Sequence, residues 1–173
     1  MLNFKKRKKT NPDASHLLAT ILVVYPIVST VSYEPKDGLI QLSFAMKGAP
    51  TQESFKEFAQ QLVDSMEAYH QLEGFSNARI EMYMEGVGET FFLHLKRDLA
   101  TLSRGELSLL TTLIDERFAD DLIMDGAHEI MDLDFLLAQE DHLDQMLSMA
   151  RQMQIPDRLV GIREHERVVV YTR

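Results

Sequence analysis

The chain of 173 residues contains no cysteine. Disulfide bonds, thiolate catalysis and zinc or iron-sulfur sites with cysteine ligands are therefore excluded. A single domain of this length buries about 70% of the surface of its unfolded chain, so it needs no covalent staple. With 45% hydrophobic and 26% charged residues, the composition is that of an ordinary globular protein with a packed core.

The apolar run at residues 17–31, LLATILVVYPIVSTV, is too short to cross a membrane as a helix. Such a helix would rise about 22 Å against a hydrocarbon core of about 30 Å, and Pro26 would break or kink it. The length suits a signal peptide, but Pro12 and Asp13 separate the run from the basic residues before it, and no A-x-A cleavage site follows. Its Ile, Val and Thr residues favour a strand with both faces covered. We therefore expect a cytoplasmic protein.

The sequence also lacks the motifs of the common catalytic and cofactor sites. There is no H-E-x-x-H, no calcium-binding D-x-D-x-D-G loop, no G-x-S-x-G and no phosphate-binding G-x-x-x-x-G-K-[ST]. The segment Gly86-Val87-Gly88 lacks the third glycine and the helix of a dinucleotide site, so it indicates a hairpin turn. We expect no cofactor, while a Ser/His/Asp triad assembled only by the fold stays open.

A basic leader on an acidic body is the clearest positive feature. The first nine residues hold five cations and no acid, on a chain with a net charge of -9. Removing them leaves 13 basic and 27 acidic side chains, a balance of -14. Such a body repels the phosphates of nucleic acid, and without a lipidation signal the leader supports at most weak, peripheral membrane binding. An acidic protein surface is the better partner for these cations: Lys5, Lys6, Arg7, Lys8 and Lys9.

The hydrophobic pattern predicts an α+β fold. We expect a mostly antiparallel sheet of about six strands, in three strand pairs, with about three amphipathic helices packed on one face. Residues 1–15 would form a flexible basic leader and residues 16–173 a single domain. The expected strand pairs are 21–33 with 39–46, 78–85 with 89–96, and 159–162 with 167–172. Because Val168, Val169 and Val170 are apolar on both faces of the last strand, we expect that strand inside the sheet.

Three helices are expected between these strands. The first covers residues 52–72, with Thr51 as its N-cap and Gly74 at its end. The second follows the capping box formed by Ser103 and Glu106, and continues past Leu122 to a stop at 125–126. The third covers residues 133–153.

Eleven carboxylates against one arginine, Arg117, make the segment 115–144 unusually acidic. Carboxylate and imidazole groups are suitable ligands for divalent cations, although the spacing fits no known metal motif. The candidate ligands are Asp125, His128, Glu129 and His142. A solvated acidic face on two helices is the simpler interpretation, and we expect no bound metal.

Every basic residue after Lys96 is arginine, which holds carboxylates and phosphates in a bidentate manner. Arg163 and Arg167 flank the tip of the last strand pair and are candidates for partner contact, although Glu164 and Glu166 lie between them. We interpret the chain as a non-enzymatic module for protein interaction or self-association, in which the leader and the acidic segment pair across protomers. The alternative is a small hydrolase or metal-dependent enzyme that uses the acidic segment.

Overall fold

The computed structural model describes residues 12–75, 77–124, 133–165 and 167–173. Its elements, in chain order, are α1 (Pro12–Val24), β1 (Thr30–Glu34), β2 (Leu39–Met46), α2 (Gln52–Glu73), β3 (Ile80–Val87), β4 (Thr90–Asp98), the short 3-10 helix η1 (Leu99–Thr101), α3 (Arg104–Phe118), α4 (Leu133–Ala150), β5 (Leu159–Glu164) and β6 (Arg167–Thr172). Among the described residues, no helix is both long and apolar enough to span a membrane.

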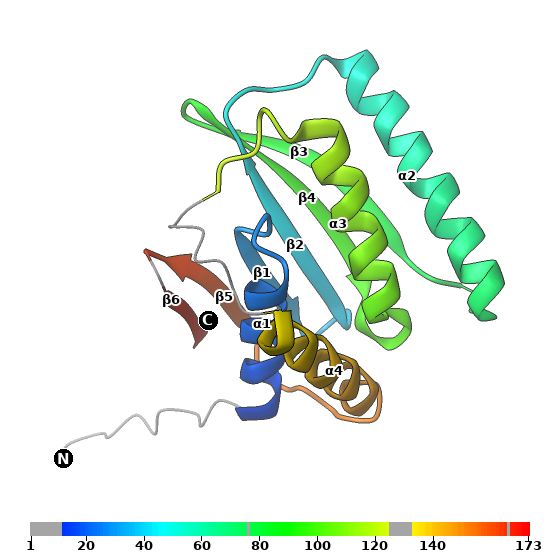
Figure 1. Cartoon of the computed structure of the whole chain (residues 1–173), viewed down its shortest axis with the longest axis vertical. Helices are drawn as coiled ribbons and strands as arrows, with labels where there is room; N and C mark the ends of the chain where they lie inside the picture. The colour runs from blue at the N-terminus through cyan, green and yellow to red at the C-terminus, as the bar shows by residue number, and fades with distance from the viewer. Residues whose placement is uncertain (1–11, 76, 125–132, 166) are drawn as a thin grey trace.

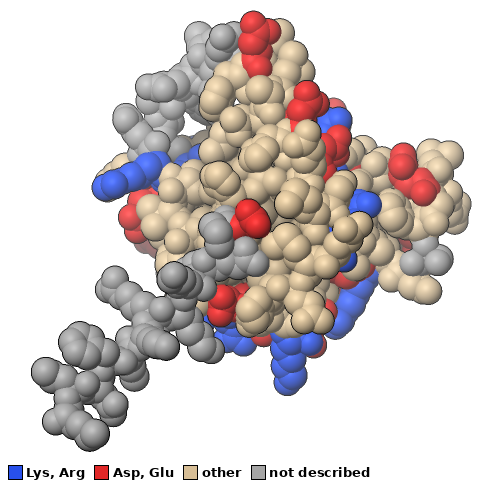
Figure 2. All heavy atoms as spheres, turned by 90° about the horizontal axis from the view of Figure 1, so that it is seen from below, with Lys and Arg blue, Asp and Glu red and all other residues tan. Residues whose placement is uncertain are grey.

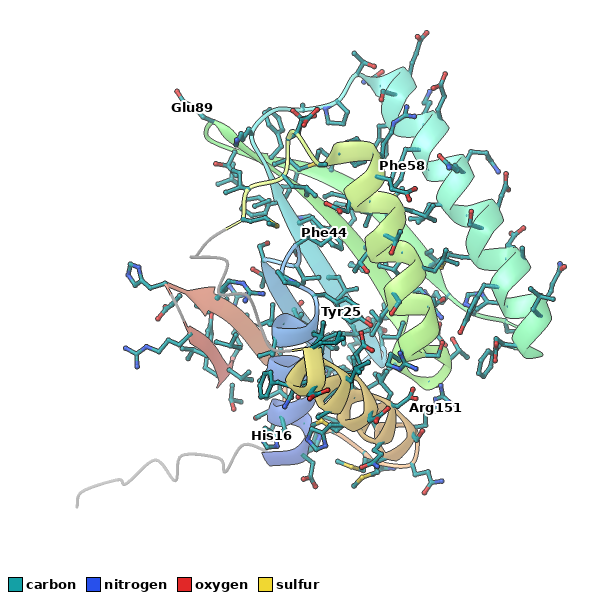
Figure 3. All side chains as sticks on the ribbon, in the orientation of Figure 1. His16, Tyr25, Phe44, Phe58, Glu89 and Arg151 are labelled. Atoms are coloured by element: carbon teal, nitrogen blue, oxygen red, sulfur yellow. The ribbon has the colours of Figure 1, made fainter. Side chains whose placement is uncertain are left out.

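The six strands form one antiparallel sheet in the order β3-β4-β2-β1-β5-β6, with the helices on one of its faces (Figure 1). This arrangement confirms the predicted α+β fold. In β2 the residues that face the helices are Ile40, Leu42, Phe44 and Met46, all at most 1% exposed. Phe44 lies at the centre of the layer between the sheet and the helices (Figure 3).

Helix α1 corrects the prediction of a strand over residues 21–33. The apolar run begins as a helix, and only Thr30–Glu34 is extended. Helix α1 packs between the sheet and α4 (Figure 1), which explains why its residues are apolar on several sides. The helix starts at Pro12, where proline does not weaken the helix because an amide at the first helical position has no hydrogen-bond partner within it. It ends before Pro26. The last four residues of the expected leader, 12–15, thus belong to α1, and the expected three helices become four.

Helix α2 follows its prediction closely. The Thr51 side chain accepts a hydrogen bond from the Ser54 amide at 3.1 Å, and Gly74 ends the helix with a left-handed φ of 76°. The buried face carries Phe58, whose ring packs edge-on against Phe118 of α3 at 4.9 Å (Figure 3). The caps and the apolar stripe were therefore sufficient to place this helix.

Helix α3 departs from its prediction at both ends. Ser103 caps the first turn by accepting a hydrogen bond from the Glu106 amide at 3.2 Å, but the Glu106 carboxylate binds other groups instead of completing the capping box. The helix ends at Phe118, and Leu122 pairs with Met46 at the end of β2. The segment after α3 therefore extends along the sheet instead of continuing the helix. Helix α4 likewise ends at Ala150, before the expected Met153.

Strand β6 lies at the edge of the sheet, so the prediction that it lies inside is wrong. Its register with β5 places Val168 and Val170 on the face that carries α1, and Val169 on the opposite face. Val168 and Val170 are apolar because they pack under α1, while Val169 is partly exposed on the other face. Apolar residues on both faces of a strand therefore do not require a neighbouring strand on each side.

A buried ion cluster ties β4 to α3 and α2. Arg97 and Glu106 are both fully buried, and two guanidinium nitrogens, Nε and Nη2, each donate to a Glu106 carboxylate oxygen at 2.9 Å. Nε2 of His70 in α2 is hydrogen-bonded to the same carboxylate, and Arg97 also contacts Asp98 and donates to the Arg79 carbonyl at 2.9 Å. Nearly every polar atom of this buried pair is thereby satisfied.

Candidate functional site: a trough on the uncovered face of the sheet

One face of the sheet carries no described helix, and its central strands bear small side chains there. Alternation along β2 places Gln41, Ser43 and Ala45 on this uncovered face, opposite the core residues. The register of β1 with β2 sets Thr30 beside Ser43 and Ser32 beside Gln41. Larger side chains stand on both flanks: Tyr83, Phe92, His94 and Lys96 from β3 and β4, and Val160, Ile162 and Tyr171 from β5 and β6. We call the resulting depression the trough.

Two hollows lie along the trough. The first, of about 420 Å³, opens at the β1–β2 turn over Ser32, Gln41, Lys96 and Val160. The second, of about 390 Å³, opens at the other end over Thr30, Ala45, Phe92 and Ile162. From Leu39 to Ala45 the trough follows seven residues of β2, and the six steps between them span about 20 Å at 3.3 Å per residue. It can therefore hold an extended segment of about six residues.

The first hollow is positively charged on an acidic molecule. Its described lining contains four cationic and two acidic side chains, a balance of +2: Lys36, Lys96, Arg158 and Arg173 against Glu34 and Asp37. Arg158 pairs with Glu34, and the Lys96 ammonium lies 5.5 Å from the centre of the Tyr83 ring. Figure 2 shows the molecule from below, with several long Lys and Arg side chains projecting from its outline. The sign of this local charge is opposite to that of the whole chain, whose net charge is -9.

The second hollow has mostly apolar walls. Pro26, Val28, Ala45, Phe92, Ile123 and Ile162 contribute to it. The one charged residue of its described lining, Arg163, donates to the carbonyls of Leu22 and Val28, so its guanidinium is held against the end of α1. The two ends of the trough therefore differ in chemistry, one cationic and one apolar.

A chain of polar side chains crosses one flank of the trough. The Tyr83 hydroxyl donates to Gln41 Oε1 at 3.0 Å, and Gln41 Nε2 lies 3.2 Å from His94 Nδ1. Ser43 Oγ lies 2.7 Å from the same ring nitrogen. Burial lowers the pKa of His94, an effect that Glu85 opposes and Lys96 reinforces. His94 Nε2 is buried and has no hydrogen-bond partner in the described part of the chain, which is unusual for a buried polar atom.

Ser43, His94 and Glu85 bring together the residue types of a hydrolytic triad, with His94 Nε2 3.7 Å from Glu85 Oε2. However, Ser43 is only 3% exposed, so a substrate carbonyl has no approach to its hydroxyl. Its strand pairs on both sides with β1 and β4, and those ladders engage the amides that would have to stabilise an oxyanion. This geometry does not support acyl transfer at Ser43.

The acidic segment does not assemble a metal site among the described residues. Asp125, His128 and Glu129 lie outside them, and His142 is exposed on α4, where its ring contacts His16 of α1 (labelled in Figure 3) at 6.0 Å. No three His, Asp or Glu side chains of the described ranges converge on a common point. Within the segment, Glu140 and Asp144 instead form ion pairs with Arg104 at 3.7 and 3.5 Å.

Of the candidate partner-contact residues, the two that the structure describes lie on opposite faces of the sheet. The leader cations, residues 5–9, lie outside the described residues. Arg163 faces the helices, whereas Arg167 stands opposite Glu164 in the β5–β6 ladder and lies on the other face. Arg158 and Arg173, which line the cationic hollow, were missed as site residues. Their signal in the sequence was the arginine-only C-terminal region, which had suggested an anion site without showing which arginines converge.

Comparison of this chain with known protein families, curated proteins and solved structures found no match. The geometry of the trough is thus the basis for a functional assignment.

Proposed function

We propose that this protein is a non-enzymatic binding module that holds an acidic segment of a partner protein in the trough. The observation that carries this proposal is the cationic hollow, with a balance of +2 on a chain of net charge -9. Opposite fields of this kind steer a partner to the site and fix its orientation. The basic leader of the same chain has the wrong sign to occupy the hollow.

The two hollows specify the order of groups in the partner segment. Acidic side chains suit the end that holds Lys96 and Arg173, since the Arg173 guanidinium can bind a carboxylate with two hydrogen bonds. Arg158 adds positive charge there but is already paired with Glu34. Apolar side chains suit the other end, where Phe92 and Ile162 lie partly exposed. An extended segment of about six residues, acidic at one end and apolar at the other, matches the length of the trough.

A synthetic peptide tests the proposal directly. The probe is a fluorescein-labelled peptide with three glutamates, a Ser-Gly step and a Leu-Phe pair, and its binding is measured by fluorescence polarisation. The Lys96→Glu variant reverses one charge in the hollow and is expected to weaken binding about tenfold. Raising the NaCl concentration from 50 to 300 mM is expected to weaken binding to the unmodified protein as well.

The matched control is Lys56→Glu, which makes the same charge change on the exposed side of α2. It changes the net charge equally but leaves the trough intact, so binding should be retained. Equal losses with both variants would show only a dependence on net charge. That result, or an unmodified protein that does not bind the peptide, would contradict the proposal.

A further inference from the structure

Strand β6 presents a free edge that has the character of an interface. It is the last strand of the sheet, and no described segment pairs with its outer side. Its sequence, RVVVYT, contains no proline or lysine of the kind that usually protects an edge strand. Tyr171 on this strand is 43% exposed. An unprotected edge rich in β-branched residues readily pairs with another strand.

The ladder with β5 determines which groups point outward. The Arg173 amide donates to the Arg158 carbonyl at 2.9 Å, so these residues form a hydrogen-bonded pair. In an antiparallel ladder such pairs alternate with pairs that are not hydrogen-bonded to each other. The amides of Val169 and Tyr171 therefore point toward β5, whereas those of Val168 and Val170 point to the free edge. Two amide groups and two carbonyl groups are thus available to a new strand.

We propose that β6 pairs antiparallel with β6 of a second copy of this chain, which joins two sheets into one of twelve strands. The pairing sets Val168 against Val170 of the second copy, which satisfies the outward amides on both sides. Val169 then stands opposite its own counterpart, and Arg167 stands opposite Tyr171 of the second copy. A symmetric two-fold interface of this kind closes on itself and yields a dimer.

Charge favours this register over the one in which Val170 faces its own counterpart. If Val170 faced its own counterpart, Arg167 would stand opposite Arg173 of the second copy, and that contact of like charges would occur twice. In the proposed register the Arg167 guanidinium lies beside an exposed tyrosine ring, which attracts a cation. The pair of Val169 side chains lies on the uncovered face, where both become buried.

The absence of cysteine makes a site-specific test straightforward, since any introduced thiol is the only one in the chain. Directly opposed residues that are not hydrogen-bonded to each other bring their Cβ atoms to about 4.5–5.5 Å, close enough for a disulfide. Full-length Val169→Cys is therefore expected to form a covalent dimer under mild oxidation, seen on non-reducing electrophoresis. Sedimentation equilibrium of the unmodified protein should show a mass near twice 19.9 kDa.

Two controls separate the proposed register from chance collision. Tyr171→Cys places a thiol on the same strand and face, but about 13 Å from its counterpart along the strand, so it should remain monomeric on the gel. Val87→Cys places a thiol at a 54% exposed position of the opposite edge strand. Equal cross-linking of all three variants, or an unmodified protein that is monomeric at every concentration, would overturn the proposal.

Discussion

Arg97 shows how a charged residue can lie in the core without an isolated charge. Its guanidinium holds both oxygens of Glu106, and the remaining donors reach Asp98, Thr101 and a backbone carbonyl. Moving two charges out of water is costly, so such a pair adds little net stability compared with a well-packed apolar pair. The pair instead fixes the position of the start of α3 relative to β4.

The Arg97–Glu106 pair yields a prediction about stability. Arg97→Leu leaves the Glu106 carboxylate buried without its main partner, and should lower the free energy of unfolding by about 3–5 kcal/mol. The double variant Arg97→Leu/Glu106→Leu should recover part of that loss, because the fully buried Glu106 carboxylate is no longer left without its partner. Urea unfolding followed by circular dichroism measures both. A double variant less stable than Arg97→Leu would contradict this account.

His94 predicts how stability depends on pH. Burial lowers its pKa in the folded state below the ordinary 6.5, so below that value the unfolded chain binds a proton that the folded chain resists. The contribution to stability is therefore complete above pH 6.5 and decreases as the pH falls toward the folded-state pKa. Thermal unfolding from pH 8 to 5 should show a smaller decrease for His94→Gln than for the unmodified protein. The exposed His142→Gln is the control, and its profile should parallel that of the unmodified protein.

At the scale of elements, the predictable features were those encoded within a few residues. Thr51 and Gly74 bounded α2 because caps act over one helical turn, and the alternating residues of β3 identified its pleated face. Helix α1 was not predictable in this way. An apolar run satisfies either a buried strand or a buried helix, and only α4 packing on its outer side decides between them. The place of β6 at the edge is likewise a property of strand order, which local sequence does not specify.

The contact between α2 and α3 makes a second stability prediction. Tyr69 of α2 lies over Gly105 of α3, where an added Cβ atom would stand 2.3 Å from the Tyr69 hydroxyl oxygen. That hydroxyl also lies 3.0 Å from Ser103 Oγ, the cap of α3. Replacing a helical glycine with alanine alone should stabilise by about 0.5–1 kcal/mol. Here the tyrosine would have to move and lose its contact with the cap, so Gly105→Ala should destabilise the protein instead.

A double-mutant cycle isolates this contact. In the Tyr69→Leu background the obstruction is absent, and Gly105→Ala should become stabilising by about 0.5–1 kcal/mol. Urea unfolding of the four proteins gives the coupling energy between the two positions. If Gly105→Ala had the same effect in both backgrounds, the packing of Tyr69 over Gly105 would not limit the residue at that position.

At the scale of the whole molecule, the candidate site arises from strand order. The four cations of the hollow come from three different strand pairs: Lys36 from β1–β2, Lys96 from β3–β4, and Arg158 and Arg173 from the ends of β5–β6. They come together because β1 and β2 lie between the other two strand pairs in the sheet. The arginine-only C-terminal region and the polar face of β3 could be recognised in the sequence. Their convergence over a floor of small residues could not, because the pairing of distant strands depends on the complete core.

The two proposals together predict avidity for a bivalent ligand. Pairing of the β6 strands places both troughs on the same face of one sheet, with their midlines six strand spacings apart, about 29 Å. Two copies of the acidic peptide joined by a flexible Gly-Ser linker of about 28 residues have a matching root-mean-square span. Once one end is bound, the second binds at a local concentration in the millimolar range. The bivalent ligand should therefore bind at least about tenfold more tightly than the single peptide.

The oligomeric state provides the decisive comparison for this prediction. The Val169→Arg variant sets two cations against each other at the centre of the β6 interface. Because Val169 does not line the cationic hollow, the substitution leaves the trough in place. This variant should bind the single and bivalent peptides with nearly equal affinity per acidic segment. A linker of four residues, which spans at most about 14 Å, should also remove the gain in the unmodified protein. If the bivalent peptide still bound more tightly to Val169→Arg, or with the short linker, the higher affinity would arise from rebinding at one trough. That result would contradict the dimer while leaving the proposed binding function intact.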